Sequence, residues 1–370
     1  MGRDTATHIG FYGLMNVGKS TLVNRLTGQQ TVIVSAEAGT TTDPVRRSYE
    51  LTDYGPVVLV DTAGVDDTQS ELGQLRVERS LQTLTEVDVA VVLLYGMEPC
   101  TEEQRLLDTV QANEIPTVIL PCRAAGLSAE EVWQRIRQAI PHPSQTLPPF
   151  FGDRTIAAGD VLLLVCPIDS AAPAGRLILP QVQALRAALD LHAVAVTVQP
   201  DELPQALTQW RPRLIITDSQ VFREVTEVVK KRCPEVEVTS FSVLLADLKG
   251  DKTLYTEGLQ AVDRLRAGDR VLIIENCSHQ VTCDDIGRSK IPGWLQEYTG
   301  IESLEFVFVS GRDPLPAELH TTPGYFALAV QCGGCVATRR MVQARIRAAH
   351  RNGVPITNYG MLIRKMRVRP

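Results

Sequence analysis

Apolar and polar positions alternate along the first part of the chain in blocks of two kinds. Short apolar runs of strand length, among them "HIGFYG", "PVVLV" and "VAVVLLY", are separated by longer stretches with helical spacing, such as "GKSTLVNRLTG" and "TEEQRLLDTVQANE". Strands that alternate with helices along a chain predict a parallel sheet with helices packed on its faces. We therefore expect an α/β domain over residues 1–145.

The same alternation continues in two further segments. A Pro-rich stretch, "PHPSQTLPPFFGDRT", is typical of a linker, which we place at residues 146–156. Strand-like runs such as "VLLLVCPI" and "RLIITD" then predict a second α/β domain over 157–246. The run "RVLIIE", further strands and a basic helix predict a third α/β domain over 247–370. A length of 370 residues suits two or three domains.

The chain carries no signal for export or for a membrane. None of its apolar runs approaches the roughly 20 residues of a membrane-spanning helix, and "MGRDTATHIGFYG" lacks the apolar core of a signal peptide. We expect a cytoplasmic protein without a membrane partner, in which thiols stay reduced. Its eight cysteines are then free, catalytic or metal-bound rather than paired in disulfides.

Charge is unevenly spread along the chain. The formal net charge is −6, yet from Val336 to the end there are nine Lys and Arg residues and no Asp or Glu. An acidic body argues against a nucleic-acid partner for the whole protein. The basic end is either a solvated helix face or a seat for something anionic.

A phosphate-binding loop is the clearest motif. The stretch "GLMNVGKST" follows an apolar strand and opens a helical stretch, which is the context that such a loop requires. Backbone N–H groups would surround the phosphates, Lys19 would neutralise their charge, and Ser20 would bind Mg²⁺ through its hydroxyl. The expected nucleotide contacts are Gly13, Asn16, Val17, Gly18, Lys19, Ser20 and Thr21.

Two further segments supply partners for this loop. In "VVLVDTAG", Asp61 ends a strand and can hold Mg²⁺ through water, while the backbone N–H of Gly64 can meet the γ-phosphate. The stretch "EAGTTTDPV" offers Thr40, Thr41 and Thr42 as a switch that closes on Mg²⁺. The order of these segments resembles that of Ras-like GTPases, which implies an N-terminal P-loop GTPase domain whose catalytic residues are Lys19, Thr41, Asp61 and Gly64.

This order of motifs resembles the Era/TrmE-like branch of the GTPases. The resemblance implies that Thr41 is the magnesium ligand and that Asn16 binds potassium. The family motif Asn-Lys-x-Asp, which reads guanine, is replaced by "VILPCRAAG", so the choice between guanine and adenine stays open. Val65 stands where a Ras-type enzyme has its water-orienting Gln, which predicts slow intrinsic hydrolysis unless potassium or a partner completes the site.

Cysteines near the end of the chain form the second candidate site. Cys277 and His279 lie in "NCSHQ", and Cys332 and Cys335 lie in "QCGGC". Three thiolates would suit a 4Fe–4S cluster with one exchangeable iron, and His279 as a fourth ligand would complete a zinc site. A redox dithiol and unligated thiols are further alternatives, with Cys283 as a reserve ligand. We expect structural roles for Cys100, Cys122, Cys166 and Cys233.

The whole chain resembles HydF, the family of FeFe-hydrogenase maturation GTPases. The resemblance rests on "NVGKST", "GTTTDPV" and "DTAGVDD", on "GDVLLLVCPIDSAAPAGRLILPQVQALR" and "TSFSVLLADLKGD", and on "GDRVLIIENCSH", "DDIGRSKIP", "CGGC" and "ITNYG". It implies a GTPase domain, a dimerisation domain and a cluster-binding domain. The family motif is Cys-x-His followed by His-Cys-x-x-Cys. Here Cys277 and His279 match, and Gln331 replaces the second His.

The resemblance also implies a role. Cys277, Cys332 and Cys335 would bind a 4Fe–4S cluster, with His279 as a candidate fourth ligand. The protein would be a homodimeric scaffold that receives a transient diiron precursor from radical-SAM maturases and delivers it to apo FeFe-hydrogenase, with GTP hydrolysis gating partner exchange. Two alternatives remain: a regulatory Era/TrmE-like GTPase with a structural zinc site, and a degenerate copy that binds a cluster without useful GTP turnover.

Overall fold

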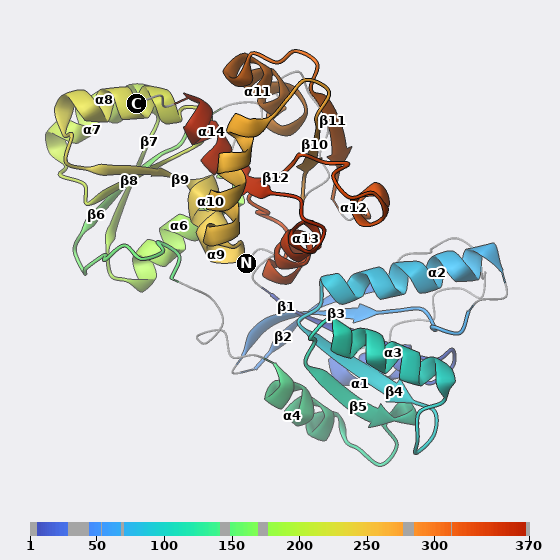
Figure 1. Ribbon diagram of the computed structural model, residues 1–370. Helices are drawn as coiled ribbons and strands as arrows, with labels where there is room; N and C mark the ends of the chain where they lie inside the picture. Colours follow the sequence, from blue (N-terminus) through green and yellow to red (C-terminus); the bar gives the residue numbers. More distant parts are fainter. Residues whose placement is uncertain are drawn as a thin grey trace. The chain divides into compact units, whose positions relative to one another are not determined.

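The computed structural model describes the chain in eight stretches: residues 6–28, 44–52, 54–67, 70–140, 149–168, 177–276, 285–311 and 313–367. The chain divides into two compact units, Met1–Thr146 and Leu147–Pro370. The first unit holds one sheet and the second unit holds two (Figure 1). Helices connect the parallel strands of all three sheets, so the expected α/β class is confirmed.

The first unit is built around a five-stranded sheet. Its strand order is β2-β3-β1-β4-β5, in which only β2 runs antiparallel to its neighbour. The central strands β1 and β4 are buried almost throughout, as expected of a sheet covered on both faces. The elements are β1 (Thr7–Gly13), α1 (Lys19–Thr27), β2 (Val45–Leu51), β3 (Gly55–Asp61), α2 (Glu71–Gln82), β4 (Val89–Leu94), α3 (Thr101–Ala112), β5 (Thr117–Pro121) and α4 (Ala129–Ala139).

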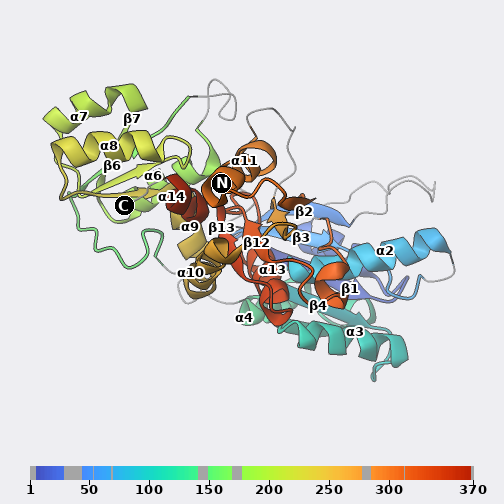
Figure 2. The ribbon, with the colours of Figure 1, turned by 45° about the horizontal axis from the view of Figure 1, so that its top comes forward.

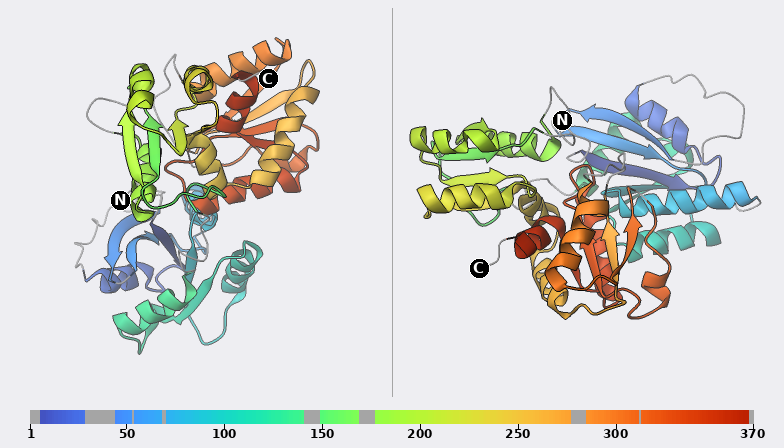
Figure 3. Two further views of the ribbon diagram at one scale, coloured as in Figure 1. Left: turned by 90° about the vertical axis from the view of Figure 1, so that its left-hand side faces the viewer. Right: turned by 90° about the horizontal axis from the view of Figure 1, so that it is seen from above.

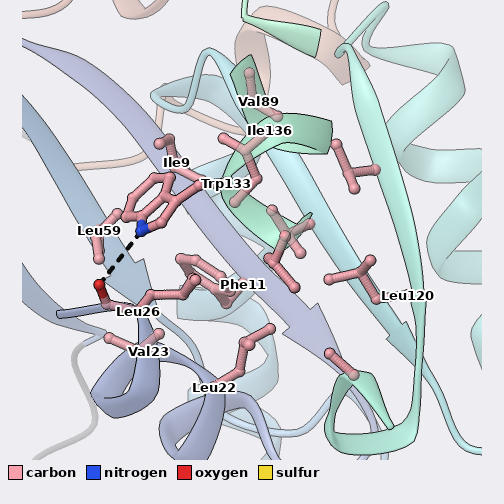
Figure 4. Close-up of a cluster of buried hydrophobic side chains, with 14 of the residues drawn as sticks. Ile9, Phe11, Leu22, Val23, Leu26, Leu59, Val89, Leu120, Trp133 and Ile136 are labelled. Atoms are coloured by element: carbon pink, nitrogen blue, oxygen red, sulfur yellow. Dashed lines mark hydrogen bonds between the residues drawn. The ribbon is translucent and has the colours of Figure 1, made fainter. Parts of the chain in front are cut away.

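One face of this sheet is closed by α1 and α4. Trp133 of α4 lies among apolar side chains of β1, β3 and α1, and its Nε1 donates to Leu26 O at 3.3 Å (Figure 4). The ring of Trp133 also stacks on Tyr49 of β2, with centroids 5.4 Å apart. Buried apolar area with a satisfied indole N–H holds the helices, and therefore the loop before α1, firmly on the sheet.

The second unit begins with a four-stranded parallel sheet in the order β7-β6-β8-β9. Phe151, within the stretch expected as a linker, is 2 % exposed and packs with Leu162 and Leu244 in its core. The packed part of this unit therefore starts before residue 157, because an aromatic side chain anchors the incoming chain. The elements are β6 (Val161–Val165), α6 (Leu179–Asp190), β7 (Val194–Val198), α7 (Leu203–Gln209), β8 (Leu214–Thr217), α8 (Phe222–Arg232), β9 (Glu237–Ser240) and α9 (Phe241–Lys249).

The third sheet is also parallel, in the order β11-β10-β12-β13. Alternate residues of β10 and β12 belong to two cores, one formed with α13 and the other with α11 and α14. These helices are labelled around the strands in Figure 2. The elements are α10 (Lys252–Ala261), β10 (Arg270–Ile274), α11 (Ile291–Thr299), β11 (Glu305–Val309), α12 (Glu318–Thr321), β12 (Leu328–Gln331), α13 (Arg339–Arg351), β13 (Ile356–Asn358) and α14 (Tyr359–Arg367).

The order of the third sheet creates a topological switch point. From β10 the chain moves to β11 on one side and later to β12 and β13 on the other, so the crossovers diverge between β10 and β12. In open α/β sheets, ligands bind outside the carboxyl ends of the strands at such a point. The segments that leave these two strands begin with Glu275 and with Cys332.

Helix α9 joins the two sheets of the second unit (Figure 3). It follows β9 directly, yet Ser242 Oγ donates to Asn358 Oδ1 of β13 at 3.3 Å. A Cβ at Gly360 would lie 2.8 Å from Ser242 Cβ, so the close approach requires glycine there. None of the helices described is both long and apolar enough to cross a membrane.

Candidate functional site

The loop between β1 and α1 has the shape of a phosphate cradle. Gly13 and Gly18 have φ values of 143° and 99°, which only glycine adopts readily. A Cβ at Gly18 would also lie 2.5 Å from Arg123 Cγ. Lys19 is 7 % exposed, and its Nζ donates to Gly13 O at 3.1 Å and to Leu14 O at 2.7 Å. The ammonium group therefore lies inside the loop, where phosphate charge would gather.

The electrostatics of this loop fit a nucleotide with Mg²⁺. Burial lowers the pKa of Lys19, while the negative charges of Asp61 and Asp66 act to raise it. Burial raises the pKa of Asp61, while a hydrogen bond from Ser20 and the positive charge of Lys19 act to lower it. Among the residues described, no partner reaches the buried Oδ1 of Asp61. A carboxylate oxygen and a hydroxyl side by side are ligands that Mg²⁺ accepts, directly or through water.

The segment after β3 packs directly on this loop. Val65 N donates to Gly13 O at 3.3 Å, and a Cβ at Gly64 would lie 2.5 Å from Met15 N. Met15 N donates to Asp66 Oδ1 at 2.6 Å, so a carboxylate already caps one N–H of the loop. The sequence "DTAGVDD" gives no local sign of a role for Asp66, because only the tertiary contact distinguishes it from an ordinary acidic turn residue.

The segment after β5 reaches the opposite side of the loop. Arg123 N donates to Val17 O at 3.0 Å, and Cys122 Sγ lies 3.5 Å from the same oxygen. In the sequence this segment continues with Ala124 and Ala125 and contains no carboxylate. The side chains of Asn16 (φ 59°), Ser20 and Thr21 are exposed. Thr40, Thr41 and Thr42 lie outside the described residues.

The Cys-x-x-Cys turn lies at the switch point of the third sheet. Cys332 follows β12 immediately, and its N–H donates to Ile274 O of β10 at 2.9 Å. Asn276, two residues beyond β10, donates to Cys332 Sγ from its backbone N at 3.1 Å and from Nδ2 at 3.4 Å. Cys335 lies in the same turn, after Gly334 with φ 65°.

The other predicted ligands cannot be placed. Cys277, His279 and the reserve ligand Cys283 lie outside the described residues. In the stretches that the structure does describe, no group of three or more His, Cys, Asp or Glu side chains is arranged to hold a metal ion. What the structure supplies is the place of Cys332 and Cys335 and the donors around one sulfur.

Lys249, the last residue of α9, supports the cysteine turn. Its side chain is 3 % exposed, and Nζ donates to Gly334 O at 2.8 Å, to Ala337 O at 3.0 Å and to Cys335 O at 3.4 Å. Gly333 packs on Leu245 of the same helix. Sequence reasoning missed Lys249, although it lies in the quoted stretch "TSFSVLLADLKGD", because nothing local links that stretch to the cysteines.

The remaining predicted residues have varied surroundings. Gln331 is fully buried, where its Nε2 donates to Asn276 Oδ1 at 3.3 Å. Arg339 and Arg340 begin α13 half-buried, and burial lowers the pKa of Arg339. Cys166 is buried, and its pKa is raised to about 12 by burial and by the charge of Asp218. Cys100 is exposed, whereas Cys122 and Cys233 are partly buried.

Comparison with protein families identifies all three parts of the chain. Residues 253–368 match the hydrogen maturase F tetramerization domain, and residues 151–250 match the hydrogen maturase F dimerization domain. Together these two domains cover more than half of the chain. Residues 8–122 match the family described as 50S ribosome-binding GTPase.

Individual relatives are GTPases. The tRNA modification GTPase MnmE of Neisseria gonorrhoeae is 43% identical over 102 residues, which are 27% of this chain and 22% of that protein. MnmE of Staphylococcus haemolyticus is 42% identical over 108 residues, 29% of this chain and 23% of that protein. The chain thus spans less than a quarter of these relatives. A crystal structure of Aquifex aeolicus Era with GDP and AlF4− is 17% identical and covers 88% of this chain and 97% of that one, with a TM-score of 0.27.

Proposed function

This chain belongs to the hydrogen maturase F family, and we propose that it is a GTP-hydrolysing scaffold of FeFe-hydrogenase maturation that holds a 4Fe–4S cluster. The observation that carries the proposal is the Cys332–Cys335 turn at the switch point of the third sheet, in a domain specific to that family. Two N–H donors on Cys332 Sγ suit a sulfur that carries negative charge.

The first unit would bind and hydrolyse GTP. Lys19 lies where it would meet the β- and γ-phosphates, and Ser20 with Asp61 would hold Mg²⁺, with Thr41 as the remaining switch ligand. Because Val65 replaces the water-orienting Gln, turnover would be slow, and potassium at Asn16 would raise it. Exchanging sodium for potassium in a phosphate-release assay tests that role, since equal rates in the two salts would exclude it.

The third domain would hold the cluster on Cys277, Cys332 and Cys335. The three-cysteine set leaves one iron for an exchangeable ligand, which is the chemistry that a carrier of a diiron precursor needs. His279 remains a candidate for the fourth position. The Cys-x-x-Cys turn supplies two ligands from one tight loop, and Asn276 directly precedes the third ligand in the sequence.

The second domain would form a homodimer. Apolar side chains on α6 and on the edge strand β7 are exposed, with Val182 at 46%, Leu189 at 67% and Val194 at 41%. An open strand edge beside exposed apolar groups suits a twofold interface in which the sheet continues into a second copy. The partners in the cycle would be radical-SAM maturases, which supply the precursor, and apo FeFe-hydrogenase, which receives it.

Anaerobic purification tests the cluster directly. We expect iron and acid-labile sulfide in the protein after reconstitution, with an electron paramagnetic resonance (EPR) signal of a reduced 4Fe–4S cluster. Each of Cys277→Ser, Cys332→Ser and Cys335→Ser should lose most of the iron, whereas Cys100→Ser and Cys166→Ser should retain it. Zinc in place of iron would contradict the scaffold proposal and favour a GTPase with a structural zinc site. Full iron in Cys332→Ser would show that Cys332 is not a ligand and would contradict the three-cysteine site.

A further inference from the structure

A buried network of hydrogen-bonded polar side chains ends on the sulfur of Cys332. Tyr255 of α10 donates from its hydroxyl to Gln331 Oε1 at 3.1 Å, and Gln331 Nε2 donates to Asn276 Oδ1 at 3.3 Å. Asn276 Nδ2 in turn lies 3.4 Å from Cys332 Sγ. Tyr255 and Gln331 are fully buried, and Asn276 is 4 % exposed. This network connects a helix, two strand ends and the cysteine turn.

The donors around Asn276 fix the orientation of its side-chain amide. Arg345 of α13, 6 % exposed, donates from Nη1 to Asn276 Oδ1 at 3.0 Å. A guanidinium group can only donate, so the oxygen of the amide must face it. Gln331 presents a second donor to the same oxygen. The NH₂ group of Asn276 is therefore turned toward Cys332, where it also donates to the backbone oxygen at 3.1 Å.

Arg345 ties this arrangement to the sheet. Its Nη1 also donates to Glu275 O at 3.2 Å, after β10, and its Nη2 donates to Gly311 O at 2.7 Å, after β11. The guanidinium thus anchors two strand ends while it holds the Asn276 oxygen. Rotation of the Asn276 amide would turn its NH₂ group toward the N–H donors of Arg345 and Gln331. In a buried environment that loss of hydrogen bonds costs free energy.

We propose that Asn276 is a positioning residue for Cys332, and that Gln331 orients Asn276 instead of binding metal. The proposal rests on the proposed cluster site. Two N–H donors on one thiolate stabilise its negative charge and so favour the reduced cluster. Gln331 stands where the family has a histidine, but both polar atoms of its side chain are engaged in the network. Turning it toward a metal would leave Tyr255 Oη without its acceptor and would remove one of the two donors to Asn276 Oδ1.

Asn276→Asp tests the proposal with almost no change of shape. The carboxylate keeps its contact with Arg345 but turns an acceptor toward Cys332 Sγ. We expect a tenfold shift in the ratio of reduced to oxidised cluster, which for a one-electron couple lowers the midpoint potential by about 59 mV. The measurement is a redox titration followed by EPR. The matched control is Asn358→Asp, because Asn358 is an equally buried amide at the same edge of the sheet that donates to Gln331 O.

A second readout does not need the cluster. In iron-free protein, alkylation of Cys332 by iodoacetamide, followed by peptide mass spectrometry, reports how readily its sulfur carries charge. We expect Asn276→Asp to slow it severalfold relative to Asn358→Asp. If the wild type binds no iron, the proposed cluster fails, but this rate still tests Asn276. The inference would be overturned if Asn276→Asp were alkylated at the wild-type rate. It would also be overturned if the cluster-loaded Asn276→Asp protein had the wild-type midpoint potential.

Gln331→Leu separates orientation from ligation. We expect it to retain iron and its EPR line shape, with a potential shifted in the same direction as in Asn276→Asp, because the amide is less firmly held. Loss of iron, or a new line shape, would make Gln331 a ligand and overturn its assignment. If Asn276→Asp and Gln331→Leu both fail to fold, the network serves the sheet rather than the sulfur, and the inference is also overturned.

Discussion

Single residues around the two loops show what local sequence can and cannot predict. The spacing of glycines with Lys19 and Ser20 predicted a phosphate loop, because backbone conformation and charge are encoded within one short stretch. By contrast, Asn276 and Lys249 contact Cys332 and the turn after it from segments far away in the sequence. Their residue types are ordinary for a strand end and a helix end, so only tertiary contact gives them a role.

Lys19→Ala should remove GTP hydrolysis. The ammonium group lies inside the loop on Gly13 O and Leu14 O, so its loss leaves phosphate charge unpaired in the transition state. We expect a fall in turnover of about 100-fold or more, measured as phosphate release. Lys252→Ala is the control, since that side chain is 65 % exposed on α10. Unchanged turnover in Lys19→Ala would contradict the nucleotide site.

Gly334→Ala should disrupt the cysteine turn. Its φ of 65° strains any other residue, and a Cβ would lie 2.8 Å from Val342 Cγ2. We expect a loss of about 1–3 kcal/mol of unfolding free energy, measured in denaturant, together with loss of bound iron. Gly324→Ala is matched, because φ is 77° there but nothing lies within 4 Å of the added Cβ. If both substitutions lowered the unfolding free energy equally, backbone strain alone would explain the loss at Gly334, without a contribution from packing of the turn.

Helices and strands were more predictable than their associations. Alternating apolar runs predicted three α/β segments because strand and helix periods are local properties of a chain. The boundary predicted at residue 246 falls within α9, which continues directly from β9. The pattern could not reveal that Ser242, Leu245 and Lys249 on that helix face the third sheet and its cysteine turn. A family-specific stretch in the sequence thus has a physical reason in contacts between domains.

Lys249→Met should loosen the cysteine turn from α9. The buried ammonium donates to three turn carbonyls, and methionine keeps the length of the side chain while removing every donor. Hydrogen bonds from charged donors contribute about 1.5–3 kcal/mol each, and the bonds are not additive, so we expect a loss of about 2–4 kcal/mol in a denaturant titration. Lys252→Met is the matched control. A variant as stable as the wild type would mean that the turn holds its shape without α9.

At the scale of the whole molecule, strand order determines where the cysteine site and the open sheet edge lie. Three predicted α/β segments and a net charge of −6 describe the class of protein but not how its elements assemble. Strand order, by contrast, is set by long-range packing, and it alone brings the ends of β10 and β12 together as a site. The same packing leaves β7 at the edge of the middle sheet, beside exposed apolar side chains on α6.

Leu189→Lys should separate the homodimer into monomers. Leu189 lies on α6 with 67% of its surface exposed, and a second copy would bury it, so an ammonium there would have to be desolvated on association. We expect light scattering at micromolar concentration to give the mass of a dimer for the wild type and of a monomer for Leu189→Lys. Met97→Lys, on the first unit and 99% exposed, introduces the same charge outside the proposed dimerisation domain and should remain dimeric. A dimeric Leu189→Lys, or a monomeric wild type, would show that α6 does not form the interface. If the monomeric variant keeps its nucleotide turnover and its iron, each site lies within one copy of the chain, and dimerisation serves the docking of partners rather than the chemistry of either site.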